Sequence, residues 1–183
     1  IGDGRVVFIE SRNPALAAEK SSRIGSLELY KDLWLVSLDA ASGRVQWERR
    51  IELPAEPNVV VLYTTLAEGK IVIVDSTDRY HVIACDARDG AELWRKEHAF
   101  LRKDHGAHMY HPVVARGTVI VEPFGYDLAT GDVRFSGLPK RGGCSTMSAA
   151  ADSVHYIDWD YDKGSMYFWD LSTDSRRQMS GQR

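Results

Sequence analysis

Two stretches of this chain carry the same pattern of residues, LVSLDAASGRVQW at 35–47 and VIACDARDGAELW at 82–94. In both, an Asp follows a β-rich run, a Gly stands four residues after it and a Trp eight residues after it. The pattern returns with a final Phe in YDLATGDVRF, and only its front half persists in FWDLSTDSRRQ. The repeated residues are Asp39, Gly43 and Trp47; Asp86, Gly90 and Trp94; Asp127, Gly131 and Phe135; and Asp170. A chain that repeats one unit builds a fold in which each unit packs on the next.

The repeated Asp residues are 41 to 47 residues apart, an interval that is typical of the four-stranded blades of a β-propeller. The segments GRVVFIE, NVVVLYTT, KIVIVD, VVARGTVIVEP and SVHYIDWD are rich in β-branched and aromatic residues and read as strands. A tight hairpin turn is expected at Arg116-Gly117, because Gly accepts a positive φ. We therefore predict an all-β chain, a β-propeller with about four four-stranded blades at residues 1–53, 54–100, 108–138 and 141–183.

One segment departs from the β pattern. The stretch NPALAAEKSSRIGSLELYKDLW is rich in Ala, Glu, Lys and Leu, and it predicts a short helical insertion near residues 15–23 within the first blade. The chain opens at IGDGRVVF without a Met and closes in the polar tail STDSRRQMSGQR. We expect an incomplete propeller of seven or eight blades, whose remaining blades in the same polypeptide are the first partners of this chain.

Each repeated residue has a structural role that its chemistry suggests. An Asp at the end of a strand hydrogen-bonds the backbone two residues further on and starts a turn. The Gly supplies the left-handed conformation that closes the turn. The aromatic residue is expected to lie flat between neighbouring blades, where it buries a large area.

Composition and charge exclude some functions. The net charge is -3, whereas a nucleic-acid-binding surface needs a basic surplus on one face. No apolar run approaches the roughly 20 residues that span a bilayer. The sequence therefore predicts neither nucleic-acid binding nor a transmembrane segment.

The repeated motifs resemble the pyrroloquinoline-quinone (PQQ) repeat, whose consensus is Leu-x-Ala-Leu-Asp-x-x-Thr-Gly-x-x-x-Trp. The resemblance covers nearly the whole chain and implies a β-propeller. Some members of this family are quinoprotein dehydrogenases, in which an eight-bladed propeller holds PQQ and calcium beneath an adjacent-cysteine disulfide. Others are cofactor-free scaffolds of outer-membrane assembly or large bacterial repeat proteins of the planctomycete type. The family resemblance favours a periplasmic or otherwise extracytoplasmic location.

Two functional hypotheses follow from this resemblance. The first is a non-catalytic platform that binds a protein or a small ligand through its loop face. The alternative is part of a PQQ- and calcium-dependent quinoprotein oxidoreductase of the alcohol or sugar dehydrogenase type. The chain has no adjacent cysteine pair, so the first hypothesis is favoured, and whether the protein is an enzyme stays open.

The most suggestive cluster of metal-ligating residue types is His105, His108 and His111 in DHGAHMYHP. Imidazole nitrogens are the commonest ligands of zinc and copper, and a loop could gather the three around one ion. A spacing of three places side chains on one face only in a helix, which Gly106 and Pro112 disfavour. The alternatives are a metal site and a polar loop at the mouth of the propeller.

Cysteines and a run of acids supply the remaining candidates. Cys85 lies in the apolar run HVIACDA and is expected to be a buried core residue. For Cys144, in RGGCST, a structural or disulfide role is favoured over a nucleophile, which would need an adjacent base. The acids Asp158, Asp160 and Asp162 lack the Gly and Glu of an EF-hand loop, so a solvated loop is favoured over a calcium site.

Overall fold

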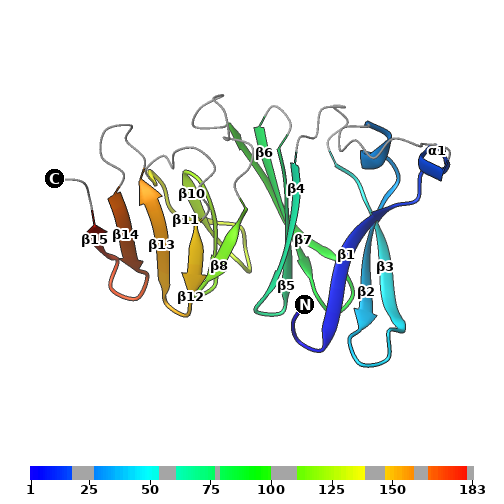
Figure 1. The fold of residues 1–183 in the computed structure, drawn as a ribbon, viewed down its shortest axis with the longest axis horizontal. Helices are drawn as coiled ribbons and strands as arrows, with labels where there is room; N and C mark the ends of the chain where they lie inside the picture. Colours follow the sequence, from blue (N-terminus) through cyan, green and yellow to red (C-terminus); the bar gives the residue numbers. More distant parts are fainter. Residues whose placement is uncertain are drawn as a thin grey trace.

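The computed structural model describes residues 1–17, 27–53, 61–76, 79–99, 111–138, 147–158 and 165–180. Within these ranges the strands form four antiparallel sheets, one of three strands and three of four. The sheets follow one another from the N-terminal to the C-terminal end of the chain, as the blue-to-red colours of Figure 1 show. In each sheet, strands that are consecutive in sequence are neighbours. This architecture confirms the predicted fold class, a partial β-propeller.

The four sheets are the blades of this propeller. Blade 1 comprises β1 (Arg5–Ser11), β2 (Leu33–Asp39) and β3 (Val45–Ile51). Blade 2 comprises β4 (Val61–Ala67), β5 (Lys70–Ser76), β6 (Arg79–Asp86) and β7 (Glu92–Ala99). Blade 3 comprises β8 (Val113–Ala115), β9 (Thr118–Val121), β10 (Phe124–Asp127) and β11 (Val133–Phe135). Blade 4 comprises β12 (Ser148–Ala150), β13 (Ser153–Asp158), β14 (Ser165–Asp170) and β15 (Ser175–Ser180).

The helical insertion begins one residue earlier than predicted. Helix α1 covers Pro14–Ala17, and a 3-10 helix, η1, covers Leu27–Tyr30. Pro14 suits the first helical position, and the side chain of Asn13 accepts a hydrogen bond from the Ala15 amide at 3.1 Å, as an N-cap residue does. Residues 18–23 of the predicted helix lie outside the described residues.

The repeated Asp and Gly form the same turn in the first three blades. The carboxylate of Asp127 accepts hydrogen bonds from the amides of Ala129 and Thr130, at 2.8 and 2.9 Å. The Gly131 amide donates to the Asp127 carbonyl at 2.8 Å, and Gly131 has a φ of 75°. Blades 1 and 2 have the same Gly-to-Asp backbone bond, also at 2.8 Å. In blade 4, Asp174 takes the Gly position and still adopts a φ of 52°.

Tryptophans from the outer strands join blade 1 to blade 2 and blade 2 to blade 3. Trp47 on β3 donates its indole N–H to the Ala87 carbonyl in blade 2, at 3.1 Å. Trp94 on β7 does the same to the Leu128 carbonyl in blade 3, at 3.0 Å. Three clusters of buried apolar residues lie between successive blades. The core of this fold is therefore a series of interfaces between sheets, as expected of a solenoid or propeller.

Candidate binding site between the first two blades

In blades 2, 3 and 4, the residue that precedes the repeated Asp faces the preceding blade. In blades 3 and 4 this residue is aromatic: Tyr126 is 3% exposed and Trp169 is 1% exposed. Tyr126 lies in the cluster that contains Trp94 of blade 2, and Trp169 packs edge-on against Phe135 of blade 3, with ring centroids 4.4 Å apart. Blade 2 has the much smaller Cys85 at this position. A small residue in a series of large ones leaves space between two sheets.

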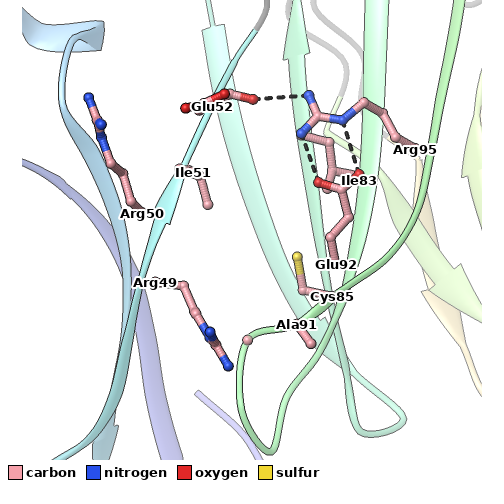
Figure 2. A pocket seen from close by; sticks show the side chains of 10 residues that line it. Arg49, Arg50, Ile51, Glu52, Ile83, Cys85, Ala91, Glu92 and Arg95 are labelled. Atoms are coloured by element: carbon pink, nitrogen blue, oxygen red, sulfur yellow. Dashed lines mark hydrogen bonds and ion pairs between the residues drawn. The ribbon is translucent and has the colours of Figure 1, made fainter.

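A pocket of about 330 Å³ occupies this space, between β3 of blade 1 and β6 and β7 of blade 2. Such a volume lies at the lower end of the range typical of small-ligand sites. Figure 2 shows Ile51 and Cys85 pointing into the pocket from opposite blades. The lining residues are Arg49, Arg50, Ile51, Glu52, Ile83, Cys85, Gly90, Ala91, Glu92 and Arg95.

Charged side chains flank the apolar floor of the pocket. On one side, Arg95 donates to both carboxylate oxygens of Glu92, at 3.2 and 2.8 Å, and to the Glu52 carbonyl at 3.0 Å. The hydrogen bond to Glu92 raises the pKa of Arg95, so this guanidinium is held charged and in place. On the other side, Arg49 donates its Nε–H to the Asp89 carbonyl at 2.9 Å. Figure 2 shows these two arginines on opposite sides of Cys85.

The thiol of Cys85 is protonated at neutral pH. Cys85 is 2% exposed, which confirms the predicted core position. Burial, together with the nearby Glu92 carboxylate, raises the pKa of the thiol to about 11. A nucleophilic cysteine needs the opposite environment, one that lowers its pKa. The pocket floor is therefore suited to packing and not to covalent chemistry.

This protonation state predicts slow alkylation of Cys85. In a Cys144→Ser variant, whose remaining thiol is Cys85, we expect iodoacetamide at pH 8 to react on the order of 100-fold more slowly than with an exposed cysteine of ordinary pKa. Mass spectrometry of the alkylated protein over time measures the rate. The same variant in denaturing urea should react at the ordinary rate, and equally fast alkylation of the folded protein would contradict the assignment.

Two buried histidines form hydrogen bonds with neighbouring side chains and backbone groups. In blade 2, His81 Nδ1 lies 2.7 Å from Asp75 Oδ1, and both residues are buried. Between blades 2 and 3, His98 donates from Nε2 to the Glu122 carbonyl at 2.8 Å and accepts from the Tyr126 hydroxyl at Nδ1, also at 2.8 Å. Burial raises the pKa of Tyr126 to about 12, so the hydroxyl remains a donor. These imidazoles serve packing between and within blades.

The environment of His98 predicts a loss of stability at low pH. Burial is the largest cause that lowers the pKa of His98 below its ordinary value of 6.5. The unfolded chain therefore binds this proton more readily, and stability is lost as the pH falls through 6.5 towards the lowered pKa. Urea unfolding between pH 7.5 and 5.5 should show a smaller decline in a His98→Gln variant, which keeps a donor and an acceptor but does not titrate. Identical declines in both proteins would contradict this prediction.

The three predicted histidine ligands are described in part. His105 and His108 lie outside the described residues. His111 Nδ1 lies 2.6 Å from the Pro112 carbonyl oxygen, and Nε2 lies 3.4 Å from Thr65 Oγ1 on β4. Its ring also packs edge-on against Tyr63, at 4.9 Å between centroids. His111 thus ties the start of blade 3 to blade 2, and the predicted metal site stays a prediction.

The other candidates also fall at the limits of the described chain. Cys144, Asp160 and Asp162 lie outside it, and Asp158 ends β13. Sequence reasoning did not single out Arg49, Glu92 or Arg95 as site residues. The signal for the pocket is a comparison across the repeats, in which the residue before Asp is Leu, Cys, Tyr and then Trp.

Stacked antiparallel sheets of three or four strands, Asp-Gly turns and aromatics between blades define a PQQ-like β-propeller repeat protein. The family model described as outer membrane protein assembly factor BamB matches residues 32–179, and the chain belongs to this family. No curated protein matches the chain. In the described part of the chain, no helix has the length and apolarity needed to cross a membrane.

Solved structures show the same fold at low sequence identity. BamB from Moraxella catarrhalis aligns with a TM-score of 0.52 at 16% identity, over 81% of this chain and 46% of BamB. The computationally designed protein Ika8 aligns with a TM-score of 0.52 at 12% identity, over 81% and 42% of the two chains. The quinohemoprotein alcohol dehydrogenase from Comamonas testosteroni aligns with a TM-score of 0.50 at 14% identity, over 82% and 32%. The chain therefore spans less than half the length of these proteins.

Proposed function

We propose that this chain is part of a non-catalytic propeller platform that binds a protein partner. The observation that carries the proposal is the pocket between blades 1 and 2. Its floor is apolar and contains a protonated thiol, while the Glu92 carboxylate on its wall is bound to Arg95. Such a site offers shape and hydrogen bonds without a nucleophile or a general base poised to act.

The quinoprotein alternative requires a site for PQQ and calcium. Calcium prefers six to eight oxygen ligands, several of them carboxylates. Across the described ranges, no three His, Cys, Asp or Glu side chains gather into a group that could hold a metal ion. The described residues therefore do not fit a calcium site.

Titration calorimetry of the full-length protein with PQQ and calcium tests this proposal. We expect no saturable heat from a sample shown to be folded by circular dichroism. Saturable binding at micromolar concentration or tighter would overturn the proposal in favour of the quinoprotein oxidoreductase. A known PQQ-dependent dehydrogenase, depleted of cofactor and titrated in parallel, is the positive control.

A further inference from the structure

Corresponding positions at the blade interfaces indicate what shape the pocket accepts. At the interface of blades 2 and 3, the Tyr126 ring lies between Trp94 and His98 of the preceding blade, at centroid distances of 6.1 and 5.9 Å. At the interface of blades 1 and 2, the residues that correspond to Tyr126 and His98 are Cys85 and Ile51. The pocket lies where the chain's own aromatic ring stands one blade later.

The residue two positions before Cys85, on the same face of the strand, supports the same comparison between blades. Two residues before Cys85 stands Ile83, whereas blades 3 and 4 have Phe124 and Tyr167 at the matching place. Phe124 and Tyr167 each pack against the apolar cluster that joins their blade to the preceding one. Blade 2 thus presents two smaller side chains where blades 3 and 4 each present two aromatic rings, and the space that results suits a planar ring.

The rim of the pocket adds a preference for negative charge. Arg95 is already neutralised by Glu92, with N–O distances of 3.2 and 2.8 Å. Arg49 donates Nε–H to a carbonyl, and within the described part of the chain no hydrogen bond or ion pair joins its terminal nitrogens to another residue. A guanidinium with open terminal N–H groups binds a carboxylate in a two-point fork. An acidic group beside the ring would therefore match this rim.

We propose that the pocket between blades 1 and 2 receives an aromatic side chain of a protein partner, with an adjacent acidic residue bound by Arg49. The inference rests on the proposed function and assigns the partner's chemistry at this site. The partner's ring packs on Ile51 of blade 1 and on Ile83 and Cys85 of blade 2. It takes the place between these two blades that the Tyr126 ring takes between blades 2 and 3. The carboxylate lies at the rim, where the guanidinium of Arg49 meets solvent.

Short peptides test the two halves of the proposal. Acetyl-Tyr-Glu-amide, acetyl-Ala-Glu-amide and acetyl-Tyr-Lys-amide are titrated into the full-length protein, labelled with ¹⁵N, and amide shifts are followed by NMR. We expect the Tyr-Glu peptide to shift the resonances of residues 90–92 and to saturate at about millimolar concentration, as a fragment of this size allows. The Ala-Glu and Tyr-Lys peptides should each bind at least about fivefold more weakly.

Variants locate the binding. Cys85→Tyr fills the pocket with a ring of the chain itself and should weaken binding of the Tyr-Glu peptide at least about tenfold. Ile83→Phe fills less of the space and replaces this variant if Cys85→Tyr does not fold. Arg49→Gln should weaken the Tyr-Glu peptide about fivefold and leave Tyr-Lys unchanged. Arg79→Gln is the matched control, because Arg79 does not line the pocket and pairs with Glu97 at 3.0 Å.

The outcomes separate this inference from the function on which it rests. Equal binding of the Ala-Glu peptide, or unchanged binding to both pocket-filling variants, would overturn the pocket inference and leave the platform untouched. Tighter binding of free 3-(4-hydroxyphenyl)propionate than of the Tyr-Glu peptide would replace the protein partner with a small aromatic acid. Saturable PQQ binding in the calorimetric titration would overturn the proposed function itself.

Discussion

Replacing Gly90 with Ala is expected to lower the free energy of unfolding by about 3 kcal/mol, the sum of left-handed strain and overpacking. Gly90 has a φ of 72°, a conformation that a residue with a Cβ adopts at a cost. A Cβ built here would lie 2.6 Å from Cζ3 of Trp47 and 2.7 Å from Cγ of Arg49. The Trp47 ring cannot retreat without losing its hydrogen bond to the Ala87 carbonyl.

Gly43→Ala is the matched control for this prediction. Gly43 occupies the same position of the turn in blade 1, with a φ of 69°, but no atom lies within 4 Å of its built Cβ. This variant should lose about 1 kcal/mol, the conformational cost alone. Urea unfolding followed by circular dichroism measures both variants. Equal losses would mean that the contact between Gly90 and Trp47 carries no weight in the stability of the blade interface.

The sequence predicted the structure well wherever the interactions that determine it join residues close together in the chain. An Asp that binds amides two residues ahead and a Gly with positive φ act within one turn, so the repeat predicted where strands end. The hairpin at Arg116-Gly117 is another local case, since both residues have positive φ, of 49° and 65°. Strand composition then sufficed to predict the sheets, and the period of the repeat predicted the propeller.

The binding pocket was not predictable in the same way, because it depends on two blades at once. Cys85 looks like an ordinary core residue in its own strand, and it is one. The small size of Cys85 matters only because blade 1 packs against it, which leaves a pocket between the two blades. Comparison with Tyr126 and Trp169 in the later blades then indicates that an aromatic ring would fill this space. The charged rim has the same origin, since Arg49 comes from β3 and the Arg95–Glu92 pair from β7.

The fourth blade has a buried aromatic residue at a position that the Asp-Gly-Trp count does not cover. Counting eight residues from Asp170 leads to Gln178, which suggests an eroded blade. At the interface with blade 3 the ring is Trp169, which directly precedes Asp170 and packs against Phe135. The residue eight after Asp faces the following blade, whereas the residue before Asp faces the preceding one. Counting from Asp170 to Gln178 therefore examines a different interface from the one that Trp169 fills.

Trp169→Ala is therefore expected to cost about 4 kcal/mol, the usual loss when a large aromatic is removed from a core. Trp169 is 1% exposed and its indole N–H donates to Asp174 Oδ1 at 2.9 Å. Arg176 also covers the ring, 4.5 Å from its centroid. Removing the ring leaves a cavity between blades 3 and 4. The two rigid sheets can move together only partly, so the cavity is not closed.

Trp169→Phe separates the two contributions, because it keeps a ring against Phe135 and deletes the indole N–H. We expect a loss of about 1.5 kcal/mol, from one hydrogen bond and a smaller ring. Asp174→Ala should lose about as much in the wild-type background and less when combined with Trp169→Phe, because the two residues share one bond. Urea unfolding of the wild type, the two single variants and the double variant gives this coupling. If Trp169→Ala were no more damaging than Trp169→Phe, the ring would not be what holds blade 4 to blade 3.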